Sequence, residues 1–268
     1  MSVFVIADFH LSGSVEKPMD RFGSRWRNYR EKIPARWRET VRDGDTVILP
    51  GDLSWGMTLD EADADLRFLE GLPGQKILLK GNHDYWWPTS AKFQSYLDRE
   101  GFSTIRFLYN SAFLCESFII CGTRGWYSDA RQGGRDEADD AKILAREAGR
   151  LTLSLKEGVK LRERCEREDG TSPEILAFLH YPPLFADTVS PELIGVLERF
   201  CVRRCYFGHI HGVYSVPALR KYKGMEFRLI SSDYLDFYPF WIDPLPPAGP
   251  DGSVHRSSDF CPEIVTEK

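Results

Sequence analysis

Short apolar segments that end in polar, metal-capable side chains recur five times along this chain. The segments are 3–7, 46–49, 76–79, 175–179 and 204–207, and each has the length of a buried strand. They are followed by Asp8 and His10, by Asp52, by Asn82-His83-Asp84, by His180, and by His209 and His211. Ligands of layered α/β folds bind at the carboxyl ends of strands. The pattern therefore predicts an α/β fold with a functional site at a sheet edge.

The segments between these strands carry helical periodicity. We expect helices over 25–41, 59–70, 88–100 and 191–200, with Pro34 able to split the first. Thr58 and Glu61 form the sequence pattern of a capping box before the second. Three short runs within 105–121 predict a hairpin or meander, and 213–216 and 226–230 predict late strands. The charged stretch 140–168 predicts one or two helices with a solvated outer face.

The length of 268 residues suits one large domain. We assign residues 1–238 to it, including a helical insertion at about 128–172, and residues 239–268 to a Pro-rich C-terminal tail. The net charge of −5 argues against a large nucleic-acid surface. No apolar stretch approaches the roughly 18 residues of a membrane span. The N-terminus does not have the pattern of a signal peptide, and none of the six cysteines forms a Cys-x-x-Cys pair, so we expect free thiols and a cytoplasmic location.

Five of the six histidines fall directly after these strands, and only His255 does not. In an extended segment residues i and i+2 point the same way, so His209 and His211 can converge on one site. Each residue alone could be a turn, cap or core residue, but packing does not explain the whole set. Imidazoles, carboxylates and one amide suit Mn, Fe, Zn or Co. The number of donors fits two ions that share one carboxylate.

Five sequence blocks resemble, in order and spacing, the calcineurin-like metallophosphoesterase superfamily: Asp8-x-His10, Gly51-Asp52, Gly81-Asn82-His83-Asp84, His180 and Gly208-His209-x-His211. The resemblance spans roughly residues 3–216, and it is specific for the superfamily but weakly specific for substrate. It implies a four-layer α/β/β/α sandwich of two mixed sheets flanked by helices. It also implies one divalent or trivalent transition-metal ion on Asp8, His10, Asp52 and His211, and a second on Asp52, Asn82, His180 and His209. His83 would be a catalytic residue that binds no metal, with Asp84 behind it.

The activity implied is hydrolysis of a phosphoester, a monoester or diester of a small or nucleotide-like molecule, by a metal-bridging hydroxide assisted by His83. Asp52 is followed by Leu53-Ser54-Trp55-Gly56, which lacks the Arg of the Ser/Thr protein phosphatase branch. The chain looks closer to small bacterial phosphoesterases whose substrates are mostly unassigned. A nuclease of the same superfamily and a non-catalytic binding scaffold are the alternatives. The charge balance disfavours the first, and the complete set of ligand residues disfavours the second.

Two further segments are candidates for substrate binding. Tyr85 and Trp86 directly follow the central block, where they either pack the next helix or form an aromatic wall for the substrate. Arg124 ends another predicted strand and either contacts phosphate or is structural. Arg131 and Arg135 would join it if the insertion folds over the site.

Overall fold

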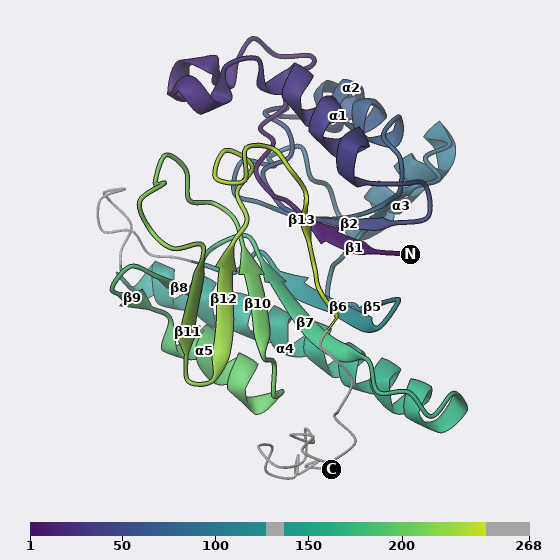
Figure 1. The fold of residues 1–268 in the computed structure, drawn as a ribbon, viewed down its shortest axis with the longest axis vertical. Coiled ribbons are helices and arrows are strands. Elements are labelled where there is room, and N and C mark those ends of the chain that lie inside the picture. Colours follow the sequence, from purple (N-terminus) through teal and green to yellow (C-terminus); the bar gives the residue numbers. More distant parts are fainter. Residues whose placement is uncertain (127–136, 245–268) are drawn as a thin grey trace.

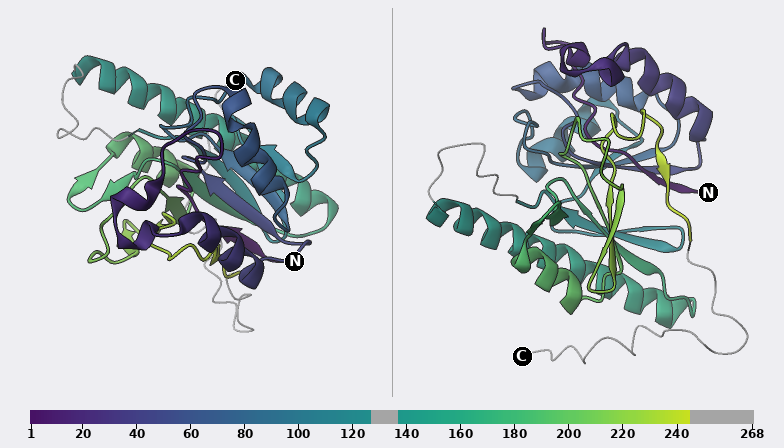
Figure 2. Two further views of the ribbon diagram at one scale, coloured as in Figure 1. Left: turned by 90° about the horizontal axis from the view of Figure 1, so that it is seen from above. Right: turned by 60° about the vertical axis from the view of Figure 1, so that its left-hand side comes forward.

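The protein is described by a computed structural model, which covers residues 1–126 and 137–244. Two large β-sheets lie face to face. Three helices cover the outer face of the first sheet: α1 (Tyr29–Thr40), α2 (Leu59–Glu70) and α3 (Ser90–Glu100) (Figure 1). Two helices cover the outer face of the second: α4 (Glu137–Glu168) and α5 (Pro191–Arg199). The turned views of Figure 2 show the same order of layers. The predicted four-layer α/β/β/α sandwich of two mixed sheets is therefore confirmed.

The first half of the chain alternates strands and helices. Its elements are β1 (Val3–Val5), the 3-10 helices η1 (Met19–Phe22) and η2 (Ser24–Trp26), α1 (Tyr29–Thr40), β2 (Thr46–Pro50), α2 (Leu59–Glu70), β3 (Gln75–Leu79), α3 (Ser90–Glu100) and β4 (Ile105–Phe107). These four strands are parallel and neighbours in the order β1-β2-β3-β4, and β13 (Phe240–Trp241), from the end of the described chain, completes the first sheet beside β1. Crossover connections that contain helices on one face of the sheet account for this arrangement.

The second half supplies the second sheet. Its elements are β5 (Phe113–Cys115), β6 (Phe118–Thr123), α4 (Glu137–Glu168), β7 (Glu174–Leu179), β8 (Leu184–Phe185), β9 (Thr188–Val189), α5 (Pro191–Arg199), β10 (Arg204–Phe207), β11 (Leu219–Tyr222), β12 (Met225–Leu229) and β13 (Phe240–Trp241). The sheet order is β11-β12-β10-β7-β6-β5, with antiparallel pairs only at its two edges. The final strand, β13, returns to pair antiparallel with β1.

The apolar side chains divide into three cores that match the layers. In β1, Phe4 packs toward the helices of the first sheet, whereas Val3 and Val5 face the second sheet. Leu151 and Leu155 of α4 pack against the outer face of the second sheet. Because successive strand residues point to opposite faces, strands buried on both sides read as unbroken apolar runs.

Several local expectations need correction. Residues 213–216 form no strand, and the predicted meander is divided between sheets, because β4 belongs to the first sheet and only β5 and β6 form a hairpin. Thr58 caps α2 by accepting from the Glu61 N–H, but the Glu61 side chain accepts from Met57 N–H instead of completing the box. Pro34 lies inside the continuous helix α1.

The charged stretch is one helix, α4, which packs on β6 and α5 and so belongs to the outer layer of the second sheet. No helix in the ranges 1–126 and 137–244 is long and apolar enough to cross a membrane. Cys115, Cys121, Cys165 and Cys205 are free thiols, as expected. Cys201 is disulfide-bonded, which contradicts the expectation at that position.

Candidate metal centre

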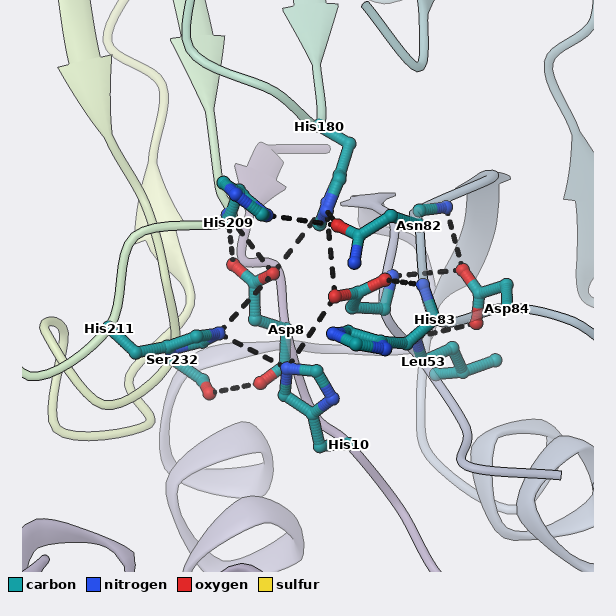
Figure 3. Close-up of polar contacts among 12 residues, drawn as sticks. Asp8, His10, Leu53, Asn82, His83, Asp84, His180, His209, His211 and Ser232 are labelled. Carbon is teal, nitrogen blue, oxygen red and sulfur yellow. Dashed lines mark hydrogen bonds and ion pairs between the residues drawn. The ribbon is translucent and has the colours of Figure 1, made fainter. Parts of the chain in front are cut away.

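The seven predicted ligand residues all follow the carboxyl ends of parallel strands. Asp8 and His10 follow β1, Asp52 follows β2 and Asn82 follows β3, all from the first sheet. His180 follows β7, and His209 and His211 follow β10, from the second sheet. Figure 3 labels six of these side chains, all except Asp52, and shows them converging from the two sheets on one spot. The stacking of the two sheets therefore assembles residues that lie far apart in the chain, such as His10 and His211, which are 201 positions apart.

The side chains form two groups of donor atoms. In the first, Asp8, His10 and His211 have donor atoms within 4.8 Å of one another, and the Nε2 atoms of the two histidines are 3.1 Å apart. In the second group, the donor atoms of Asp52, His180 and His209 also lie within 4.8 Å of one another. Asn82 belongs to the second group, because its Oδ1 lies 2.6 Å from His180 Nε2 and 2.9 Å from His209 Nδ1.

Asp52 lies between the two groups. Its Oδ2 atom is 3.6 Å from His10 Nε2 in the first group and 3.5 Å from His180 Nε2 in the second. Its other oxygen, Oδ1, accepts the backbone N–H of His83 at 2.7 Å. One carboxylate oxygen is thus directed at both groups, while the second oxygen fixes the orientation of the carboxylate.

The electrostatics of the cluster favour a bound cation. Burial raises the pKa of Asp8 to about 7, and burial together with Asp84 and Asp8 raises that of Asp52. Burial and the neighbouring His211 lower the pKa of His10, and burial and His209 lower that of His180. The neutral imidazoles of His10 and His180, together with carboxylates whose ionised form is destabilised by burial, are what a metal ion would bind.

The backbone at this edge is unusual. Asp8, His10, Asp52 and His209 have φ values of 65°, 48°, 53° and 70°, in the left-handed region. Asp and His are among the few residues other than glycine that are enriched there. This conformation turns each side chain sharply away from its strand and toward the centre.

Two glycines allow the loops to approach closely. A Cβ atom on Gly81 would lie 2.2 Å from Asp52 Oδ1, and one on Gly208 would lie 2.4 Å from Asp8 Oδ2. Both distances are far below van der Waals contact, so any side chain here would displace a carboxylate of the cluster. The glycines of the Gly81-Asn82 and Gly208-His209 blocks therefore have a steric role in the site.

His83 lies at the edge of the cluster. Its ring centroid is 4.5 Å from that of Trp55 and 5.6 Å from that of His10. Burial, Lys17 and His211 lower the pKa of His83 to about 4. The imidazole is therefore neutral at neutral pH, with one N–H group to donate.

The hydrogen bonds of Asp84 differ from those that the expected role would give. We expected it to orient His83, but no hydrogen bond between Asp84 and the His83 ring occurs among the described residues. Its buried carboxylate instead accepts N–H groups from two loops. They are Gly81 at 2.7 Å and Asp52 at 2.9 Å on Oδ2, and Leu53 at 2.9 Å, Ser54 at 3.3 Å and the Trp86 indole at 3.0 Å on Oδ1. Asp84 therefore holds together the loops that follow β2 and β3.

Asp233 is a site residue that the sequence analysis missed. Its Oδ1 lies 2.9 Å from His211 Nδ1, and its Oδ2 accepts from Gly212 N–H at 3.0 Å and Tyr214 O–H at 2.8 Å. Burial alone would raise the pKa of Asp233, but these three hydrogen bonds and the charge of His211 lower it overall. Such a carboxylate fixes the tautomer and orientation of a ligand histidine. Asp233 follows β12, so the pattern of polar residues after a strand could have revealed it.

The candidate substrate residues differ in position. The Tyr85 side chain is 58% exposed, and its ring lies 6.3 Å from that of His83. Of the two readings given for Trp86, packing agrees with the structure and an aromatic wall does not, because its side chain is 3% exposed and packs against Trp87 and Phe93 in the core. Arg124 lies beside the centre, where its carbonyl accepts the His180 N–H at 3.1 Å. Arg131 and Arg135 lie outside the described residues.

The family model of the calcineurin-like phosphoesterases matches residues 1–213. The chain belongs to the calcineurin-like phosphoesterase family. Membership implies a metal-dependent phosphoesterase, in agreement with the two groups of candidate ligands. The family match thus includes every predicted ligand residue, from Asp8 to His211.

Two other comparisons add little to the family assignment. No curated protein matches this chain. Among solved structures, the chain is similar to a protein of unknown function, AQ665, from Aquifex aeolicus. The two share 16% identity over 90% of this chain and 95% of the other, with a TM-score of 0.45. That similarity is too distant to support a functional argument.

Proposed function

We propose that this family member hydrolyses a phosphomonoester or phosphodiester of a small or nucleotide-like molecule at a centre of two metal ions. The observation that carries the proposal is the position of Asp52. Its Oδ2 is 3.6 Å from His10 Nε2 and 3.5 Å from His180 Nε2, so one oxygen is directed at both donor groups. A shared carboxylate is the arrangement that two neighbouring ions require.

The donor set fits two transition-metal ions. The first would be held by Asp8, His10, Asp52 and His211, and the second by Asp52, Asn82, His180 and His209. All donors are nitrogen or oxygen, which suits Mn, Fe, Zn or Co and disfavours soft-metal chemistry. The raised pKa values of Asp8 and Asp52 support this assignment, because a cation stabilises the ionised carboxylates.

When bound, such ions act as Lewis acids on phosphate and activate water for attack. The protein contributes orientation and hydrogen bonds. His83, neutral because its pKa is lowered to about 4, donates its N–H to a phosphate oxygen or to the leaving oxygen. The Asp84 carboxylate keeps Asp52 and His83 in place through the loop hydrogen bonds. Asp233 keeps His211 Nε2 directed at the centre.

The test is to reconstitute the protein with Mn, Zn, Co or Fe and to compare a chromogenic phosphomonoester with its bis-ester. We expect metal-dependent release of the chromophore that is lost on chelation and restored by added metal. Activity on the monoester alone would remove the diesterase half of the proposal. Failure to hydrolyse either ester with all four metals would refute it.

A further inference from the structure

A cavity of about 620 Å³ adjoins the candidate metal centre without containing any of the seven predicted ligands. It lies between the ends of β3 and β6, the start of α3 and the first half of α4. The lining residues that matter here are Lys80, Trp87, Tyr109, Arg124, Arg146 and Arg150. The volume falls within the range of about 300–1,000 Å³ that is typical of small-molecule sites.

The cavity carries an excess of positive charge. Its lining includes four cationic side chains and a single carboxylate, Glu147, which is fully buried. Glu147 accepts from Thr123 at 2.8 Å and from Arg150 Nη1 at 2.7 Å. Arg146 and Arg124 lie farther from it, at 3.6 and 3.7 Å. One carboxylate cannot neutralise four cations, so the walls are suited to an anion.

The guanidinium groups are held in place but not fully satisfied. Arg150 is fixed by Glu147 and lies over the Tyr109 ring, 5.4 Å from its centroid. The Nε atom of Arg124 is buried and has no hydrogen-bond partner among the described residues. An anchored guanidinium such as that of Arg150 loses little conformational entropy when it binds a planar or tetrahedral oxyanion. The fixed position of the guanidinium groups therefore favours anion binding in addition to the positive charge of the cavity walls.

The cavity also lies within reach of the metal centre. Lys80 precedes Asn82 by two residues, which limits their Cα separation to about 7.6 Å. Arg124 accepts the backbone N–H of His180 at 3.1 Å. Two of the cationic side chains thus come from residues that adjoin the second group of ligands. One small molecule can contact both places.

We propose that this cavity binds a second anionic group, a phosphate or a carboxylate, of the molecule whose phosphoester is hydrolysed. The inference rests on the proposed function and narrows its substrate to small molecules that carry two separated anionic groups. Trp87 and Tyr109 supply apolar surface for the part of the molecule between those groups. The first half of α4 thereby becomes a specificity element of the site.

A binding measurement tests this without requiring turnover. Metal-reconstituted full-length protein is titrated by calorimetry with α,ω-alkane bisphosphonates of two to six carbons, and with the monophosphonates of the same chain lengths. We expect at least one bisphosphonate to bind about tenfold or more tightly than its monophosphonate, the usual effect of one added charge-assisted contact. Equal binding by the two series at every length would overturn the proposal.

Variants locate the second contact. Arg146→Gln should reduce the bisphosphonate preference about threefold or more, and Arg124→Gln should reduce it further because Arg124 is less exposed. The matched control is Arg164→Gln, also on α4, since Arg146 and Arg164 side chains are 53% and 52% exposed and each lies near a glutamate. Position 164 is about 27 Å along the helix from position 146. An undiminished preference in both cavity variants, or an equal loss in the control, would refute the location.

The outcomes separate this inference from the proposed function. A wild-type protein that prefers the bisphosphonates but hydrolyses neither chromogenic ester supports the anion site and refutes the phosphoesterase proposal. Metal-dependent hydrolysis without any bisphosphonate preference supports the phosphoesterase proposal and refutes the anion site. Inorganic phosphate is titrated as well. If it binds in an Arg146-dependent manner while bisphosphonates gain nothing over monophosphonates, the site binds a separate anion and the substrate assignment is wrong.

Discussion

Replacement of Asp84 by asparagine tests whether this residue holds the two loops together or orients His83. The carboxylate accepts three N–H groups on Oδ1 and two on Oδ2. Asparagine keeps only one oxygen. In its better orientation the amide oxygen retains the three contacts of Oδ1, while the NH₂ group faces the backbone N–H groups of Gly81 and Asp52. Two buried donors then lose their acceptor.

The cost follows from those two donors. A buried, unsatisfied hydrogen-bonding group costs about 1–3 kcal/mol, so Asp84→Asn should lower the free energy of unfolding by about 2–6 kcal/mol. The matched control is Asp65→Asn, because Asp65 is also a buried carboxylate but, among the described residues, accepts only from Gly13 N–H and the Ser54 hydroxyl. The amide can retain the first contact and donate to a rotated Ser54 hydroxyl. We therefore expect a cost of about 1 kcal/mol there.

Urea unfolding of the chelated proteins measures the effect, since bound metal would otherwise add to the stability of the folded state. Metal content after reconstitution is the second measurement, and it should fall in Asp84→Asn because Asp52 is displaced. A stability loss no larger than that of the control would refute the role in holding the loops. Full stability and metal content combined with a large fall in kcat would instead show that Asp84 acts on His83.

Three other changes have defined outcomes. His83→Ala should lower kcat by about 10²- to 10⁴-fold with both metals retained, as measured by elemental analysis; metal loss in proportion to activity would show that His83 is a ligand. Asp52→Asn should lose both metals together, and retention of two ions would contradict a shared carboxylate. Lys76 is fully buried. Burial lowers its pKa to about 8, although the negative charges of Glu70 and Asp43 act to raise it. Between that value and the higher pKa of the unfolded chain, the unfolded state binds more protons, so this residue makes stability rise with pH above about 8. Urea midpoints should therefore show a smaller gain from pH 8 to pH 10 in Lys76→Met than in the wild type; equal gains would show that Lys76 is not the source.

The sequence predicts the candidate site better than it predicts the path of the chain. Residues such as Asp52 and Asn82 lie within three residues of the ends of apolar strands, and the carboxyl ends of parallel strands meet at one edge. Local order along the chain thus specifies proximity in space. The same reasoning applies to Asp233 after β12, but a single carboxylate there lacks the glycine and histidine neighbours that distinguish the other blocks.

Other features depend on long-range packing that no local pattern encodes. The runs around 105–121 have the spacing of a meander, yet β4 pairs with β3 and β5 pairs with β6, because each edge strand joins the sheet that buries its apolar face. Trp86 follows the Gly81-Asn82-His83-Asp84 block as an exposed aromatic would, but the turn directs its indole back to Asp84 and the core. Burial of a side chain after a tight turn depends on backbone angles that are not readable from residue type.

The left-handed backbone at Asp8, His10, Asp52 and His209 also restricts how this centre can be re-engineered. A cysteine or a β-branched residue at these positions would have to adopt a conformation that costs about 1–3 kcal/mol outside glycine, asparagine, aspartate and histidine. The main-chain conformation at these positions thus disfavours thiolate ligands, whichever metal is bound. Attempts to convert the centre to bind softer metals should begin at Asn82, His180 or His211, whose φ values are not positive. The loop conformation therefore restricts which metals the site can bind, because it restricts which ligand residues the backbone allows.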